Sequence, residues 1–143
     1  MTPKRLRAAL GSGPRGARVT AAGIGILRTG LGAALLARPE AMPRTLGVDR
    51  VSARRMSWAV RMFGARDAAL GLLGAHAALT GRPLRPSLLA QAASDGADVV
   101  VLALAVRQRQ VSAPRALAVA AFAVSGVVGL LATARDADGP ARH

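Results

Sequence analysis

Cysteine and tyrosine are absent from this 143-residue sequence, which has only two phenylalanines and one tryptophan. Without cysteine the chain has no disulfides, no thiolate metal ligands and no cysteine nucleophile. Hydrophobic residues make up 52% of the sequence, but most are the small or aliphatic Ala, Leu and Val, joined by 16 glycines. Small side chains suit helices that pack closely in lipid. We therefore expect a membrane protein, with a soluble alanine-rich helical bundle as the alternative.

Acidic residues are also few: 7 stand against 20 basic ones, which gives a formal charge of +13. Such an excess suits either nucleic acid or the loops that flank membrane spans. A nucleic-acid surface would place basic residues in a stripe, often with stacking aromatics. Here most arginines gather between long apolar segments. The pattern favours a lipid bilayer as the partner and no nucleic acid.

Four apolar segments predict an all-α fold, an integral membrane bundle of about four transmembrane helices. Each is close to the roughly 20 residues that cross a bilayer. Together they form a single transmembrane domain over residues 19–134, between a basic flexible tail (1–18) and a polar tail (135–143). The predicted spans are residues 19–38, 56–80, 87–106 and 116–134. The connector 38–55 has room for a short interfacial helix.

The predicted spans differ in how readily they would insert. Residues 116–134 carry no charge and should insert into a bilayer unaided. In the first segment the cost of inserting Arg28 nearly cancels the gain from the apolar side chains, so its insertion free energy is close to zero. In the second and third segments the cost of the charges exceeds the apolar gain. Three spans, or an interfacial hairpin, therefore remain open. Arg28 also interrupts the run that would otherwise resemble a secretory signal, so we expect a retained first span in a multi-pass protein of the inner (plasma) membrane.

Six charged residues lie within the apolar segments, three of each sign. They are Arg28, Arg61, Arg66, Asp67, Asp95 and Asp98. Measured at 1.5 Å per residue from the span ends nearest the first connector, Arg61 lies roughly 8 Å deep, Asp98 roughly 12 Å and the others roughly 15 Å. An isolated charge at mid-depth is expensive, so we expect ion pairs between helices. These six residues form the candidate intramembrane polar layer.

Helical periodicity assigns these residues to faces. Gln91, Asp95 and Asp98 share one face of the third segment, with Ser94 beside them. The second segment carries a small-residue stripe that should pack closely against a neighbour. That stripe comprises Gly64, Ala68, Gly71 and Ala75. The first segment has a similar face around its charge, with Ala21, Gly25, Arg28, Gly32 and Leu35. Arg66 points away from a single interface and should reach a second helix or a partner subunit.

Catalytic patterns are lacking. His76 and His143 have no partners at the spacing of a metal site or a catalytic triad. Asp95 and Asp98 at i and i+3 resemble a carboxylate metal pair, but no histidine accompanies them. The glycines of the first segment lie in an apolar run and not in a strand–turn–helix nucleotide motif. We expect no enzyme, no catalytic residue, no cofactor and no metal.

The same residues carry a resemblance to a known group of proteins. The segments are GILRTGLGAALLARPE (residues 25–40), RMFGARDAALG (61–71) and ASDGADVV (93–100). In order and spacing, over roughly residues 20–106, they resemble an uncharacterised family of small four-helix membrane proteins of GC-rich bacteria, grouped as a domain of unknown function. The resemblance implies a helical bacterial membrane protein and supplies no activity, substrate or cofactor.

Two functions follow from the polar layer. In the first, paired charges are structural or mediate assembly, as a homo-oligomer or with a membrane partner subunit. In the second, the protein is a small permease or proton-coupled carrier that uses the intramembrane charges, since ionisable residues in a membrane often mark a transport path.

Overall fold

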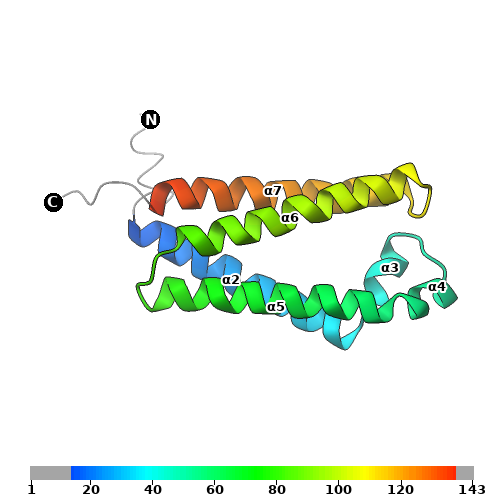
Figure 1. Ribbon diagram of the computed structural model, residues 1–143, viewed down its shortest axis with the longest axis horizontal. Coiled ribbons are helices and arrows are strands. Elements are labelled where there is room, and N and C mark those ends of the chain that lie inside the picture. The colour runs from blue at the N-terminus through cyan, green and yellow to red at the C-terminus, as the bar shows by residue number, and fades with distance from the viewer. Residues whose placement is uncertain (1–13, 138–143) are drawn as a thin grey trace, which may run out of the picture.

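The computed structural model describes residues 14–137, which form six helices and no strand (Figure 1). The prediction of an all-α fold is confirmed. The helices are α2 (Pro14–Ala37), α3 (Ala41–Thr45), α4 (Arg50–Arg55), α5 (Ser57–Leu79), α6 (Arg85–Arg107) and α7 (Ala113–Ala137). The four long helices lie along the longest axis of the molecule, and α3 and α4 lie at one end of it (Figure 1).

Helices α2, α6 and α7 extend beyond the apolar segments predicted from sequence, whereas α5 lies within the predicted range 56–80. Helix α2 begins at Pro14, so residues 14–18, expected in the basic tail, form its first turn. Proline is favoured at this position because its fixed φ suits a helix start and its missing N–H would have no partner. Arg18 then donates to the carbonyl oxygens of Ala77, Gly81 and Arg82, which ties this turn to the α5–α6 connection. At the other terminus α7 continues to Ala137. The rest of both predicted tails, residues 1–13 and 138–143, lies outside the described residues.

Helices α2 and α5 approach each other backbone to backbone. A Cβ atom on Gly25 would lie 2.6 Å from the carbonyl oxygen of Gly71, and one on Gly32 would lie 2.5 Å from that of Gly64. Only glycine allows such an approach, because any side chain would overlap the opposite helix. The predicted small-residue stripe of α5 therefore contacts the predicted small-residue face of α2.

Helices α6 and α7 form the second close pair. One apolar cluster joins both pairs near the α5–α6 turn. Its residues are Ala21, Ala77, Ala78, Leu84, Leu88, Ala92, Leu130 and Ala134. In α6 the buried residues end at Ala92, and beyond it the α6–α7 pair diverges from the α2–α5 pair (Figure 1). The bundle is thus held tightly at the end near the termini and more loosely at the opposite end.

The connector between α2 and α5 folds into the short helices α3 and α4. Asp49 caps α4, because its Oδ1 accepts hydrogen bonds from the amides of Val51 and Ser52 at 2.9 and 3.0 Å. Hydrogen bonding, first from the Ser52 side chain and then from its amide, holds the pKa of Asp49 below its ordinary value. The amide of Ser112 donates to the carbonyl oxygen of Leu46 at 3.2 Å, so the connector also touches the start of α7. The connector is therefore ordered by its own caps and by the α6–α7 turn.

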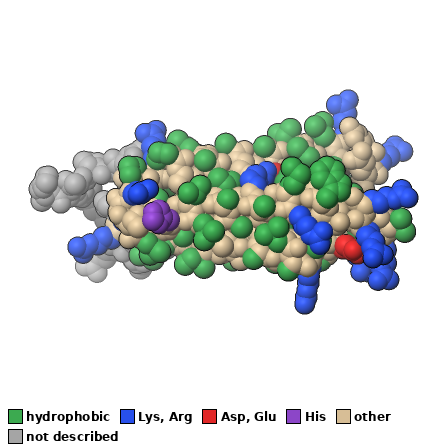
Figure 2. Space-filling model, turned by 60° about the horizontal axis from the view of Figure 1, so that its bottom comes forward, with side chains coloured by type: hydrophobic (Ala, Val, Ile, Leu, Met, Phe, Trp, Pro, Cys, Tyr) green, Lys and Arg blue, Asp and Glu red, His purple; other side chains and the backbone are tan. Residues whose placement is uncertain are grey.

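Side chains are distributed as in a protein surrounded by lipid. The buried positions hold mainly alanine and glycine, whereas large apolar side chains face outward. Leu27, Leu73 and Phe122, from three different helices, are 68%, 61% and 67% exposed. Figure 2 shows apolar side chains over the length of the molecule, and most of the arginines lie towards its ends.

Within residues 14–137, three helices are long and apolar enough to cross a membrane: Arg15–Ala37, Arg85–Arg107 and Ala113–Arg135. Helix α5 has the length of a span, but its three charged residues and His76 lower its hydropathy. The sequence predicted four spans, and composition alone supports three. Helix α5 is not one of these three.

Candidate functional site: a charge cluster between the helices

Arg28 is the centre of a charge cluster that joins three helices. From α2, its Nη2 lies 2.8 Å from Oδ1 of Asp67 on α5, and its Nη1 lies 2.6 Å from Oδ1 of Asp95 on α6. The arginine side chain is only 9% exposed. A buried guanidinium requires such carboxylate partners, because its desolvation is otherwise uncompensated. One side chain thus fixes the positions of α2, α5 and α6 relative to one another.

Arg66 forms the second half of the cluster. Its Nη1 and Nη2 donate to Oδ1 and Oδ2 of Asp98 at 3.1 and 2.6 Å, a two-bonded pair between α5 and α6. Its Nη2 also lies 3.4 Å from Oδ1 of Asp67. Asp67 therefore accepts from both arginines and links the two halves. Arg66 was expected to reach a second helix or a partner subunit, and its side chain reaches the second helix, α6, through Asp98.

An aromatic ring supports the same guanidinium. The Cζ atom of Arg66 lies 5.2 Å from the centroid of the Phe63 ring, within cation–π range. Phe63 stands three residues earlier on α5, so the two side chains share one face of that helix. Phe63 was not among the predicted site residues, although its spacing from Arg66 would have suggested the contact.

Arg61 does not join the cluster. It lies five residues before Arg66, which places it about 7.5 Å further along α5 and on a different face. Its side chain is exposed and makes no ion pair with the residues that the structure describes. It lines a pocket with Arg38 and Glu40 at the connector end of the bundle. The structure therefore brings together five of the six predicted residues and leaves Arg61 apart.

Without Arg61 the cluster is no longer balanced in charge. Two guanidiniums stand against three carboxylates, a formal charge of −1. The Arg28–Asp67 side is buried, whereas the side chains of Arg66 and Asp98 are 34% and 37% exposed. The cluster thus has an inner half that holds helices together and an outer half that reaches the surface of the bundle.

Polar side chains of α6 continue beyond the ion pairs. Ser94 lies at the edge of the cluster, with its Oγ 3.5 Å from Nη2 of Arg28. About one helical turn away, Gln91 is 1% exposed and donates to Oγ of Ser87 at 3.3 Å, while its Oε1 has no partner within residues 14–137. The predicted polar stripe of α6 therefore faces the bundle interior.

The carboxylates of the cluster are held by guanidiniums and do not form a metal site. No group of three or more His, Asp or Glu side chains in the described part of the chain could hold a metal ion. Each carboxylate instead faces a guanidinium at 2.6 to 2.8 Å. The chemistry that the cluster supports is electrostatic: it holds charges inside an apolar bundle.

Comparison with protein-family models, with curated proteins and with solved structures gives no match to this chain. The fold and the cluster themselves define the class, which is an all-helical bundle with three apolar helices of spanning length and an interhelical Arg–Asp cluster.

Proposed function

We propose that this chain is a multi-pass integral membrane protein of four spans, located in the inner (plasma) membrane, with a structural or assembly role and no catalysis of its own. One observation carries the proposal: large apolar side chains cover the outside, while small residues and charges lie between the helices. Monomeric soluble proteins rarely expose large contiguous apolar surfaces, because water opposes them. A bilayer is the solvent that suits this distribution.

Helix α5 is the fourth span in this proposal. Two of its three charges are neutralised by partners, since Asp67 pairs with Arg28 and Arg66 pairs with Asp98. Pairing removes much of the cost of placing a charge at mid-depth. Arg61 lies near the end of the helix, where a long side chain extends to the interface. Trp58, 66% exposed in the first turn, lies where indole rings favour the headgroup level.

Span number can be tested with single introduced cysteines, because the chain has none of its own. Arg50→Cys places a thiol in the connector and Arg82→Cys places one in the α5–α6 turn. If α5 crosses the membrane, a membrane-impermeant maleimide labels these two positions from opposite sides. Arg109→Cys, in the α6–α7 turn, is the matched control and should label from the same side as Arg50→Cys. Labelling of Arg50→Cys and Arg82→Cys from the same side would show that α5 does not cross the membrane. Release of the protein from membranes by alkaline carbonate would show that it is not an integral membrane protein.

The inner half of the cluster supports a structural role. Removing one partner of a buried ion pair leaves an uncompensated charge and typically costs about 3–5 kcal/mol. Arg28→Leu would leave Asp67 and Asp95 facing each other without their shared guanidinium. We expect this variant to lose its monodisperse peak in size-exclusion chromatography in detergent, whereas Arg61→Leu should keep it. Equal behaviour of the two variants would contradict the structural role.

The outer half supports assembly. Arg66 and Asp98 place one charge of each sign side by side on the surface at mid-depth, where lipid solvates charge poorly. A second membrane helix with polar side chains, or a second copy of this chain, would cover them. Cross-linking through a cysteine at Met62, which is 65% exposed on α5, should trap such a neighbour in membranes. Cross-linking that persists unchanged after Asp98→Asn would show that the charges do not direct it.

A proton-coupled carrier is the second candidate, and the excess carboxylate favours it. With three carboxylates and two guanidiniums, the cluster becomes neutral when it binds one proton. Proteoliposomes with an imposed membrane potential and an enclosed pH-sensitive dye would report proton entry. If the protein is a proton-coupled carrier, the wild type should show proton entry and Asp98→Asn should reduce it. Proteoliposomes no more permeable than protein-free vesicles would exclude it.

A further inference from the structure

Arg61 and Arg38 lie in one pocket at the connector end of the bundle. The pocket has a volume of about 270 Å³ and lies where α2 ends, α3 begins and α5 begins. Arg38 directly follows α2, and Arg61 is the fifth residue of α5. Within the described residues neither guanidinium has a carboxylate within ion-pair distance. The pocket is therefore lined by two arginines for which the described residues show no ion pair.

The carboxylate of the pocket already faces another arginine. Oε1 of Glu40 lies 3.8 Å from Nε of Arg54, the only cation for which the described residues show an ion pair with it. Ser57 also lines the pocket and is the first residue of α5, so the positive end of that helix dipole lies there. The local charge is therefore positive, and it comes from arginines, whose forked donors match the oxygens of a phosphate group.

The position of the pocket in the bundle favours the same ligand. Arg61 lies about 6 Å along the axis from the first residue of α5, near the end of the proposed span. Further arginines of the connector, Arg44, Arg50 and Arg55, surround this end of the molecule. Basic residues close to the membrane surface attract anionic headgroups, and each contributes about 1 kcal/mol of binding free energy. A phosphate group in the headgroup layer would stabilise an arginine that lies, as Arg61 does, near the end of the proposed span.

We propose that the Arg38–Arg61 pocket binds a phosphate group. The headgroup of an anionic phospholipid and a free phosphate offer the same chemistry, and the test below separates these sources. The lipid source rests on the proposed membrane location, whereas binding of free phosphate does not. The pocket is distinct from the charge cluster, because none of the five clustered residues lines it.

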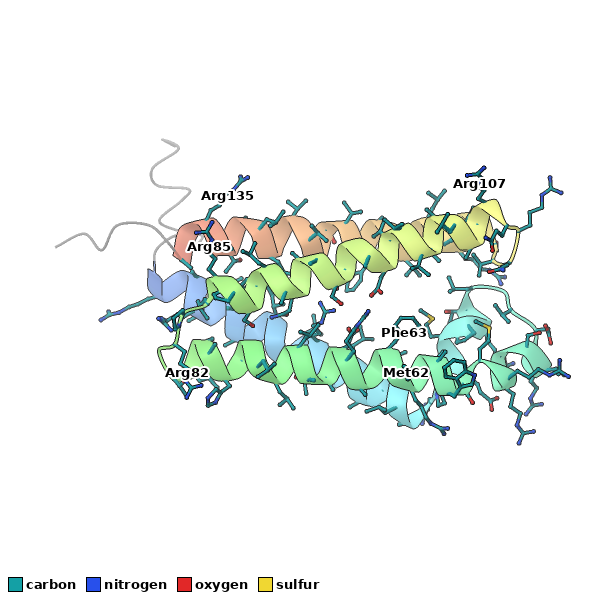
Figure 3. All side chains as sticks on the ribbon, in the orientation of Figure 1. Met62, Phe63, Arg82, Arg85, Arg107 and Arg135 are labelled. Carbon is teal, nitrogen blue, oxygen red and sulfur yellow. The ribbon has the colours of Figure 1, made fainter. Side chains whose placement is uncertain are left out.

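The test measures phosphatidylglycerol bound to the full chain in detergent by native mass spectrometry. Arg38→Ala/Arg61→Ala removes both guanidiniums of the pocket. Arg82→Ala/Arg135→Ala is the matched control, since it removes the same charge at the opposite end, where Figure 3 labels both side chains. We expect about fivefold weaker binding for each pocket arginine removed. The control double variant should bind as the wild type does.

A second arm titrates inorganic phosphate into the complex with phosphatidylglycerol. Displacement that depends on Arg38 and Arg61 assigns the site to free phosphate, and retention of the lipid assigns it to the headgroup. Equal lipid binding by the two double variants, together with no phosphate binding that depends on the pocket, overturns the proposal. Carbonate extraction of the same wild-type protein reports on the membrane location separately, so failure of the pocket and failure of the proposed function give different results.

Discussion

Replacing Gly32 by alanine tests the contact between α2 and α5 most directly. A Cβ at this position would lie 2.5 Å from both the amide nitrogen of Ala68 and the carbonyl oxygen of Gly64. These are backbone atoms, which cannot rotate aside. Because carbon contacts are optimal at about 3.5–4.0 Å, the two helices would have to move apart by about 1 Å. That movement would also loosen the neighbouring contacts of Gly25 and Gly71.

Whether a glycine-to-alanine substitution in α2 destabilises or stabilises the protein depends on whether that glycine contacts α5. Inserting one carbon into a packed interface usually costs about 1–3 kcal/mol. Gly30, two residues away on the same helix, has no atom within 4 Å of its Cβ position. There alanine should stabilise the helix by about 0.5–1 kcal/mol, because glycine has greater freedom in the unfolded chain. The two substitutions are chemically identical and should act in opposite directions.

The measurement is the midpoint temperature at which the detergent-solubilised protein loses its monodisperse size-exclusion peak. With about 4 °C for each kcal/mol in a domain of this size, Gly32→Ala should lower the midpoint by about 4–12 °C. Gly30→Ala should raise it by about 2–4 °C. If Gly32→Ala is tolerated as well as Gly30→Ala, the backbone-to-backbone contact of α2 and α5 is refuted.

Two further predictions concern a buried side chain and a helix cap. Gln91→Leu should be neutral or stabilise the bundle by about 1 kcal/mol, because it removes a buried Oε1 that has no partner among the described residues. A marked loss in the same heating assay would show that the hydrogen bond from Gln91 to Ser87 outweighs the unpaired Oε1. Asp49→Ala should lower stability at neutral pH. Since the pKa of Asp49 is lowered by folding, this difference should be complete above the ordinary value of 3.8 and disappear as the pH falls through the lowered pKa. A difference that is constant down to strongly acidic pH would contradict the capping role.

The depth of the charged layer could be predicted from sequence because it depends only on residue spacing along each helix. Arg28, Arg66 and Asp98 are all nine residues from a helix end at the connector side, so residue spacing alone places them at one level along the bundle. The small-residue stripes were predictable for the same reason, since helical periodicity alone places them on one face.

The pairing itself could not be predicted, because it depends on which helices are neighbours. The sequence does not show that α2 lies against α5, which places Arg28 beside Asp67. Nor does it show that Arg66 extends around α5 to Asp98. Arg61 was grouped with the layer by its place in an apolar segment, although its side chain is exposed and lines a pocket beside the connector. Which charged residues pair therefore depends on side-chain length and on which helices are neighbours in the fold.

The partners of Arg28 have a consequence for how the proposed membrane protein is made. Ribosomes synthesise chains from the N-terminus, and Asp67 follows Arg28 by 39 residues, with Asp95 later still. When α2 leaves the translocon, its buried arginine has neither carboxylate to meet. When α5 follows, it brings Arg66 as well as Asp67, and the surplus positive charge persists until α6 supplies Asp95 and Asp98. Stable integration of the first two long helices is thus completed by the third, and a chain truncated before α6 should be recognised by quality-control proteases as unfinished.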